Sequence, residues 1–221
     1  MPTEQNGSTK RNVFVTNGCT NHSKTERQNE DLYVTDPRAV EMLLEVEKDL
    51  RNVWEPCCGL LHIAKVLESH GILGRLSDIL NRPNDPRIEI LDFLSYEPKE
   101  LWHGSIVTNP PYKFCEQMVR KALESVADGE KVCMFLKLTF LEGKSRKKLF
   151  EELPFKTLYV SSSRLPCPKN GVFETQKLDK DGKPVFKDGK PVMEKAYAAI
   201  AYGWYVWEKG FKGDPIIKWI N

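Results

Sequence analysis

The sequence lacks several features that would assign it to other classes of protein. No apolar run approaches the roughly 20 residues that span a bilayer, and residues 1–11 lack the apolar core of a signal peptide. None of the six cysteines forms a Cys-x-x-Cys pair, and no four well-spaced zinc ligands can be drawn. These absences favour a protein of the reducing cytoplasm with no metal site, no membrane contact and no disulfide framework.

An excess of charge of one sign is also missing, because 33 Lys and Arg face 31 Asp and Glu. The length of 221 residues, with 40% hydrophobic and 29% charged residues, predicts one soluble globular domain with embellishments. The basic residues are nevertheless unevenly spread, since residues 143–195 hold 13 Lys and Arg against 7 Asp and Glu. Such clustering predicts contact with phosphates, although a solvated helix face explains its densest part equally well. That part contains Lys144, Arg146, Lys147 and Lys148.

Four consecutive residues, Asn109-Pro110-Pro111-Tyr112, form the most informative motif. They follow the short apolar run 105–108, so we expect a loop at the carboxyl end of a buried strand, where open α/β sheets bind their ligands. The prolines fix two φ angles, remove two N–H donors and hold Asn109 extended. The resulting platform suits a planar amino group. The Asn109 amide oxygen and the Pro110 carbonyl are its two hydrogen-bond acceptors, and the Tyr112 ring is its stacking surface. The alternative is a turn that merely ends a strand.

Acidic residues end three earlier strand candidates, at Glu55, Asp78 and Asp92, and Asn109 ends a fourth. Acids at the carboxyl edge of such a sheet typically hold ribose hydroxyls and other donor groups of a cofactor. A single acid in this position is as often a helix cap. Three of them ahead of the proline motif favour a cofactor site.

Strand and helix candidates alternate along the chain, which predicts an α/β fold with a mostly parallel sheet and helices on both faces. A helix is expected over 37–50, with Asp36 as its N-cap and Pro37 in its first turn. Residues 1–30 are expected to be flexible, and 31–221 to form a single domain. Within it, an insert at about 166–195 contains two Asp-Gly pairs that predict a small hairpin. This hairpin is interpreted either as a plain surface feature or as a finger that contacts nucleic acid.

The two motifs at 55–59 and 109–112 resemble those of amino-methyltransferases, which use S-adenosylmethionine to methylate exocyclic amines. The phage and mobile-element DNA adenine N6-methyltransferases look similar over nearly the whole chain. The shared stretches are 31–37, 140–144 and 204–207. The resemblance implies a Rossmann-like class I methyltransferase fold with a seven-stranded sheet. It also implies S-adenosylmethionine as cofactor and the N6 amine of adenine in DNA as substrate, in a bacterial or phage-infected cell.

The resemblance also implies roles for individual residues. Asn109, Pro110 and Tyr112 would be catalytic. The cofactor would be held by Thr35, Pro37, Glu55, Cys57, Gly59, Asp78, Asp92 and Asn109. One departure is Leu61, which stands where the first motif usually has a second glycine and which is expected to narrow the cofactor pocket or shift the turn. The neighbouring His62 is predicted to be a surface residue at a helix start.

The sequence indicates the type of reaction more narrowly than it indicates the substrate. Similar enzymes methylate RNA adenine, the N4 amine of DNA cytosine or protein glutamine, although the last usually carry an amino-terminal helical domain for which 1–30 leave little room. A relative that binds the cofactor without catalysis is a further alternative, and it rests on Leu61 alone. DNA is the expected partner, with RNA as the alternative, and no obligate protein partner is evident.

Overall fold

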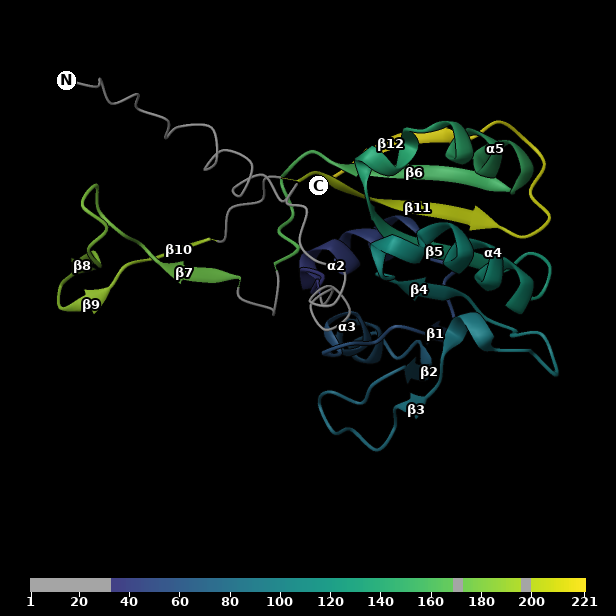
Figure 1. The fold of residues 1–221 in the computed structure, drawn as a ribbon, viewed down its shortest axis with the longest axis horizontal. Coiled ribbons are helices and arrows are strands. Elements are labelled where there is room, and N and C mark those ends of the chain that lie inside the picture. Colours follow the sequence, from purple (N-terminus) through teal and green to yellow (C-terminus); the bar gives the residue numbers. More distant parts are fainter. Residues whose placement is uncertain (1–32, 169–172, 196–199) are drawn as a thin grey trace, which may run out of the picture. The chain divides into compact units, whose positions relative to one another are not determined.

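A sheet of eight strands organises the molecule, in the order β12-β6-β11-β5-β4-β1-β2-β3 (Figure 1). All neighbouring strands run parallel except β11, which is antiparallel to both β5 and β6. The strands are β1 Val53–Glu55, β2 Leu73–Asp78, β3 Glu89–Ile90, β4 Ile106–Thr108, β5 Lys131–Lys137, β6 Phe155–Ser161, β11 Tyr202–Glu208 and β12 Ile216–Ile220. The computed structural model describes residues 33–168, 173–195 and 200–221. The expectation of a flexible segment at 1–30 lies outside these residues, as does Cys19.

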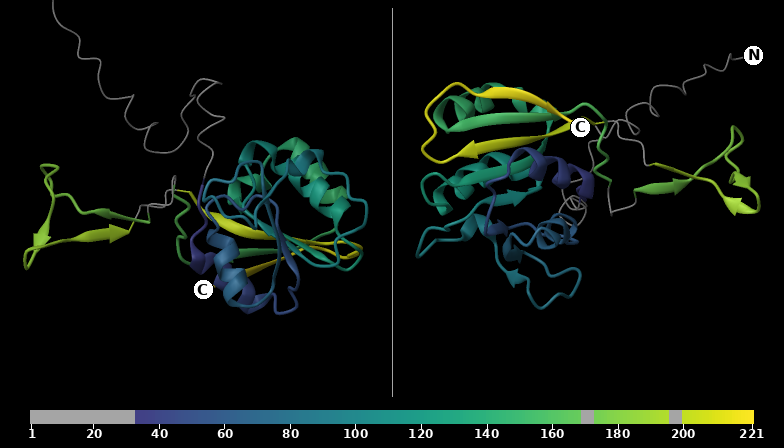
Figure 2. Two further views of the ribbon diagram at one scale, coloured as in Figure 1. Left: turned by 90° about the horizontal axis from the view of Figure 1, so that it is seen from below. Right: turned by 180° about the vertical axis from the view of Figure 1, so that it is seen from behind.

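Helices cover both faces of the sheet, as the sequence predicts (Figure 2). They are the α-helices α2 Pro37–Val46, α3 His62–Ser69, α4 Cys115–Ser125 and α5 Lys144–Glu152, with 3-10 turns η1 Phe93–Ser95, η2 Tyr112–Phe114 and η3 Leu138–Leu141. Successive side chains of β5 point to opposite faces of the sheet. Cys133 and Phe135 therefore pack with α2 and α3 on one face, whereas Met134 packs with α4 and α5 on the other. The Rossmann-like fold with a mostly parallel sheet is thereby confirmed.

Two details of the sheet differ from expectation. The sheet has one strand more than the seven implied by the resemblance, because β12 adds in parallel to the outer side of β6. Its Ile220 is buried, whereas Trp219 is 70% exposed, so the strand is only partly covered. The third strand is shorter than predicted, and Asp92 beyond it caps η1 by accepting hydrogen bonds from the Leu94 N–H and the Ser95 hydroxyl.

The insert forms two short antiparallel pairs. They are β7 Glu174–Gln176 with β10 Met193–Lys195, and β8 Phe186–Lys187 with β9 Lys190–Pro191. Asp188 and Gly189 both have positive φ, 52° and 75°, as a two-residue type I′ hairpin turn requires. The Asp-Gly signal therefore predicted this hairpin correctly. Across the described ranges, no helix is both long and apolar enough to cross a membrane.

Candidate cofactor and catalytic site

The carboxyl ends of the parallel strands meet at one edge of the sheet, on the left in Figure 1. Strands β2 and β3 follow β1 on one side of it, whereas β4 and β5 lie on its other side. The connections that leave β1 and β4 therefore run in opposite directions along the sheet. This is the switch point at which open α/β sheets bind ligands. Glu55 ends β1, Asp78 ends β2 and Asn109 follows β4, so the structure places three predicted residues on this edge.

The Asn109 amide has a defined orientation. Its Nδ2 donates a hydrogen bond to the Tyr33 carbonyl at 3.0 Å and lies 3.4 Å from Cys167 Sγ. A carbonyl accepts and cannot donate, so the nitrogen rather than the oxygen must face Tyr33. The Oδ1 atom is then left buried with no partner among the described residues. A buried unpaired acceptor costs about 1–3 kcal/mol, and a donor from a ligand would remove that cost.

The residues after Asn109 complete the platform. The Pro111 carbonyl accepts the Phe114 N–H at 2.9 Å and begins η2, whereas no described residue donates to the Pro110 carbonyl. The Tyr112 ring is half-buried, and its hydroxyl lies 3.5 Å from Cys167 Sγ. Burial raises the pKa of Tyr112 well above its ordinary value, so the ring is neutral at physiological pH. Two acceptors and an aromatic face are therefore available in the predicted positions.

Two further tyrosines lie beside the Tyr112 ring of this platform. The Tyr112 ring centroid lies 5.3 Å from that of Tyr33 and 6.0 Å from that of Tyr202, both in tilted contacts. Tyr33 and Cys167 come from segments 76 and 58 residues away from Asn109. The sequence analysis assigned neither to the site, because Tyr33 lies in the shared stretch 31–37 without a role of its own and Cys167 belongs to no motif.

Glu55 is a buried carboxyl group with no ion pair among the described residues. It is 2% exposed, and its Oε2 has no partner among the described residues. Burial, together with the nearby charge of Asp78, raises the pKa of Glu55 well above its ordinary value, against a hydrogen bond from the Ala64 backbone. A cationic donor at this carboxyl group would stabilise its charged form.

Asp78 already has several protein partners. Its Oδ2 accepts the Gly59 N–H at 2.8 Å, and its Oδ1 accepts the Leu80 N–H at 2.9 Å and Arg82 Nη1 at 3.1 Å. These bonds hold the turn after β1, where Gly59 has φ +50°. Direct contact of Asp78 with a cofactor stays a prediction, as it does for the exposed helix cap Asp92.

Leu61 has a backbone conformation that glycine adopts more readily than leucine. Its φ of +65° and ψ of 26° lie in the left-handed region, which costs a leucine roughly 1–2 kcal/mol. Its side chain is 5% exposed and packs in a small apolar cluster. The other buried members of that cluster are Cys58, Ala64, Leu76 and Ile88. The leucine thus keeps the backbone course, and its strain is offset by burial.

Further unpartnered atoms lie on the segments that begin α2 and α3. The Thr35 hydroxyl, just before α2, is buried and has no partner among the described residues. Pro37 is the first residue of α2, behind the Asp36 cap. His62 is the first residue of α3 and is half-buried rather than at the surface as predicted, and its Nδ1 is also buried and unpartnered. Burial lowers the pKa of His62, so the ring favours its neutral form.

Cys57, between Glu55 and Gly59, contributes a neutral thiol to the first motif. Burial raises its pKa well above the ordinary value, and the nearby carboxyl groups of Asp78 and Glu55 act in the same direction. The thiol is therefore a weak nucleophile. In the described part of the chain there is no group of three or more His, Cys, Asp and Glu residues that could hold a metal ion.

The basic run of α5 is largely neutralised by its own helix. Lys147 pairs with Glu151 at 2.8 Å and Lys148 with Glu152 at 3.4 Å, both at i,i+4 spacing. Arg146 donates to the backbone carbonyls of Thr139 and Glu142. Lys144 begins the helix. These pairs favour the interpretation of the run as a solvated helix face.

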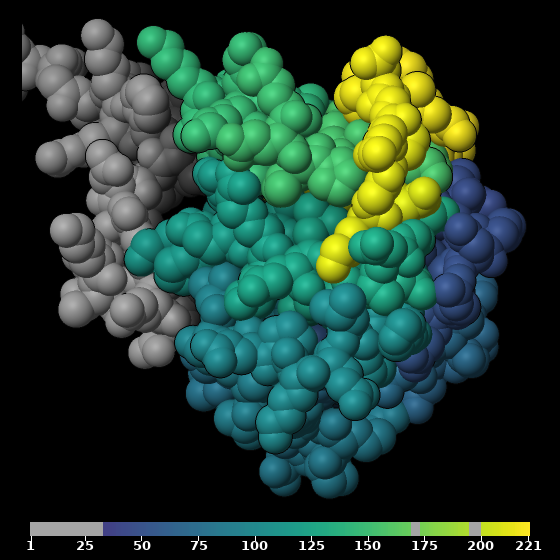
Figure 3. Space-filling model, turned by 90° about the vertical axis from the view of Figure 1, so that its right-hand side faces the viewer, coloured from purple at the N-terminus to yellow at the C-terminus, as the bar shows by residue number. Residues whose placement is uncertain are grey.

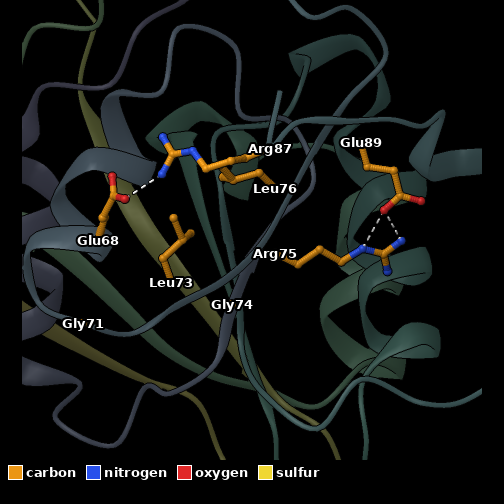
Figure 4. A pocket seen from close by; sticks show the side chains of 8 residues that line it. All are labelled: Glu68, Gly71, Leu73, Gly74, Arg75, Leu76, Arg87 and Glu89. Atoms are coloured by element: carbon orange, nitrogen blue, oxygen red, sulfur yellow. Dashed lines mark hydrogen bonds and ion pairs between the residues drawn. The ribbon is translucent and has the colours of Figure 1, made fainter. Parts of the chain in front are cut away.

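A pocket of about 530 Å³ lies away from these residues, along the part of β2 that the short β3 leaves uncovered (Figure 4). Its charged groups are paired, since Arg75 binds Glu89 at 2.6 Å and Arg87 binds Glu68 at 2.6 Å. It contains none of the predicted site residues. We therefore assign the candidate site to the carboxyl edge and not to this pocket.

No family model and no curated protein matches the sequence. Solved structures match the fold. One, described as a class I S-adenosylmethionine-dependent methyltransferase from Listeria monocytogenes, has a TM-score of 0.52 and 8% identity, over 86% of this chain and 66% of that one. The type IIG restriction endonuclease BpuSI has a TM-score of 0.51 and 14% identity, over 86% of this chain and 27% of that one. The chain thus spans less than two thirds of either structure. The likeness shows the class I methyltransferase fold.

Proposed function

We propose that the chain transfers a methyl group from S-adenosylmethionine to the exocyclic N6 amine of adenine in DNA. The observation that carries the proposal is the Asn109 Oδ1 atom, which is buried, unpartnered and oriented by the Tyr33 carbonyl. It lies at the carboxyl end of β4, beside the Tyr112 ring and the Pro110 carbonyl, to which no described residue donates. This arrangement suits an amino group attached to a flat ring.

The residues of the same edge fit the proposed cofactor. The Glu55 carboxyl group, whose Oε2 has no partner among the described residues, suits the ammonium group of the methionine part. The Thr35 hydroxyl lies on the segment that leads into α2 at Pro37. The further residues proposed to hold the cofactor are Cys57, Gly59, Asp78, Asp92 and Asn109. When bound, S-adenosylmethionine supplies an electrophilic methyl group on a sulfonium centre.

The protein's part in the reaction is to position and polarise the amine. Adenine N6 is a poor nucleophile because its lone pair is delocalised into the ring. Asn109 Oδ1 and the Pro110 carbonyl would accept hydrogen bonds from the two N–H groups of the amine. These bonds favour a tetrahedral nitrogen whose lone pair faces the methyl group. Positioning of this kind can lower a barrier by about 7–11 kcal/mol. No general base is needed before attack, since the proton leaves after the methyl group has arrived.

Tyr112 would stack on the target ring. Within a duplex the amine is paired and stacked, so the base must flip out or lie in a single strand. RNA adenine, DNA cytosine N4 and protein glutamine offer the same kind of amine to the platform, and they remain the alternative substrates. A catalytically inactive relative is less well supported than the sequence suggests, because Leu61 keeps the glycine-type turn.

The test is product identification. Purified protein would be incubated with methyl-labelled S-adenosylmethionine and, separately, duplex DNA, single-stranded DNA, RNA and cell protein, and the products would be digested for mass spectrometry. We expect N6-methyladenine in DNA. Label confined to RNA, to cytosine or to glutamine would transfer the assignment to that substrate, and no label in any sample would contradict the proposal.

A further inference from the structure

Lys137 places a positive charge directly on the catalytic platform. It is the last residue of β5, and its side chain is half-buried at the carboxyl edge. Its Nζ lies 4.6 Å from the centroid of the Tyr112 ring and 5.6 Å from that of the Tyr33 ring. The ammonium group therefore lies against the ring that is proposed to receive the target base, and it must move aside when a base stacks there.

This ammonium group has no carboxylate partner within the described ranges, which distinguishes it from other lysines of the sheet. Lys131, at the opposite end of β5, binds Glu47 and Asp49 at 2.6 Å each, and Lys156 of β6 binds Glu208 at 2.6 Å. The groups that surround Lys137 are aromatic rings and the neutral thiol of Cys167, whose pKa is raised by burial. A half-buried cation whose described neighbours are aromatic rings and a neutral thiol is available to an incoming anion.

We propose that Lys137 binds the phosphodiester next to the target nucleotide, an inference that rests on the proposed function and names how that site recognises a nucleic acid. The contact would form as the base displaces the ammonium group from Tyr112. A hydrogen bond to the ring nitrogen beside the target amine is the less favourable alternative, because it would draw electron density from the attacking nitrogen. A phosphate contact has no such effect, and it gives a nucleic acid an advantage over a peptide.

The structure thereby assigns the phosphate contact to a residue other than the basic run of α5. Lys147 and Lys148 have glutamate partners on their own helix, so their charge is compensated before any nucleic acid arrives. Lys137 has no such partner among the described residues, and it lies beside Tyr112 rather than on an exposed helix. A single cation in this position would bind a phosphate of the nucleic-acid strand that enters the site.

Salt dependence of binding tests the proposal. Each phosphate contact contributes roughly −0.9 to the slope of log K against log salt concentration for duplex DNA and roughly −0.7 for single strands. Affinity for a fluorescent oligonucleotide would be measured over a salt series with wild type, Lys137→Met and Lys137→Arg, each with S-adenosylhomocysteine bound. We expect Lys137→Met to weaken binding and to make the slope less steep by about one contact, whereas Lys137→Arg keeps the wild-type slope.

Lys218→Met is the matched control. Lys218 also has no ion pair with any residue in the described ranges, but it lies on the exposed edge strand β12, in a pocket with Glu47 and Lys131. Its loss removes the same charge from the chain and should leave the slope unchanged. An equal change of slope in both variants would show a general charge effect and would overturn the proposal.

Kinetics and a modified substrate separate a phosphate contact from a role at the base. Lys137→Met should raise KM for the nucleic acid with little change in kcat. A neutral methylphosphonate beside the target nucleotide should weaken wild-type binding but have no further effect on Lys137→Met. An unchanged slope, or a fall in kcat at constant KM, would contradict the proposal. Because binding is measured without turnover, a wild type that binds with the expected salt response but methylates nothing would contradict the proposed function alone.

Discussion

The buried carboxyl groups at the two edges of the sheet differ in how the protein satisfies them. At the amino edge, onto which Figure 3 looks, Glu47 is 6% exposed and accepts bonds from Lys131 Nζ and the Tyr159 hydroxyl, each at 2.6 Å. At the carboxyl edge, Glu55 is 2% exposed, and it and Asn109 each keep an oxygen without a partner in the described structure. Buried polar atoms in folded proteins are nearly always paired. The difference teaches that the protein itself satisfies the buried carboxyl group of the amino edge, whereas the carboxyl edge keeps acceptors that are available to a ligand.

The pKa values follow the same division. At the amino edge, burial lowers the pKa of Lys131, but hydrogen bonds to Asp49 and Glu47 more than offset this, so the pKa is raised. At the carboxyl edge, burial raises the pKa of Glu55 with no cation to oppose it. Strongly shifted groups without a protein partner are typical of functional sites.

The largest effect is expected from Asn109→Ala. Loss of the oriented acceptor should lower turnover on the order of 10³-fold, because its oxygen is proposed to act in the transition state. S-adenosylmethionine should still bind, as calorimetry would show. Asn109→Asp is the control, since it keeps an acceptor oxygen and should retain part of the activity. Unchanged turnover in Asn109→Ala would show that the carboxyl edge has another task.

Lys131→Met tests the amino edge. It leaves the buried Glu47 without its cation, so the free energy of unfolding should fall by about 3–5 kcal/mol in chemical denaturation. Turnover per folded molecule should not change. The exposed Lys218→Met should alter stability by less than about 0.5 kcal/mol. If Lys131→Met instead abolished cofactor binding at unchanged stability, the two edges would not be separate in function.

Glu55→Gln should separate stability from binding. Because the folded pKa of Glu55 is raised above its unfolded value, folding favours the protonated form, and stability is lost as pH rises from the unfolded pKa to the folded one. Without cofactor, the glutamine variant should therefore be more stable than wild type at pH 7 and equal to it near pH 4. Its affinity for S-adenosylmethionine should be about 10–100-fold lower, because a charged partner is missing. Thermal unfolding at both pH values and calorimetry would measure this, and a pH-independent difference in stability would refute the explanation.

The smallest effect concerns Leu61. Leu61→Gly loses a buried side chain but relieves the left-handed strain, whereas Leu61→Ala loses the burial and keeps the strain. The glycine variant should therefore be about 1 kcal/mol more stable than the alanine variant, although glycine is smaller. It should also retain or tighten S-adenosylmethionine binding. Denaturation curves that place alanine above glycine would show that the strain argument is wrong.

Strand ends and turn chemistry made much of this fold predictable. Runs of apolar residues ending in Glu55, Asp78 and Asn109 placed these groups on one edge, because the carboxyl ends of parallel strands meet there. The neighbours of Asn109 were not predictable, since Tyr33 and Cys167 reach it from distant segments that no local pattern connects.

The contacts of the charged side chains were also predictable only in part. The pairing of Lys147 with Glu151 follows from helical i,i+4 spacing and was available in the sequence. The position of Lys137 against Tyr112 depends on the course of β5 and of the loop after β4, which no local pattern in the sequence connects.

Calorimetric titration of the wild-type protein with S-adenosylmethionine tests the difference between the two edges most directly. We predict one bound cofactor per chain and retained binding in Lys131→Met. We also predict release of a proton on binding at a pH below the folded pKa of Glu55, seen as a dependence of the heat on the buffer, because Glu55 becomes charged when a cation binds it. No binding at millimolar cofactor would contradict the claim that the unpartnered groups of the carboxyl edge form a cofactor site.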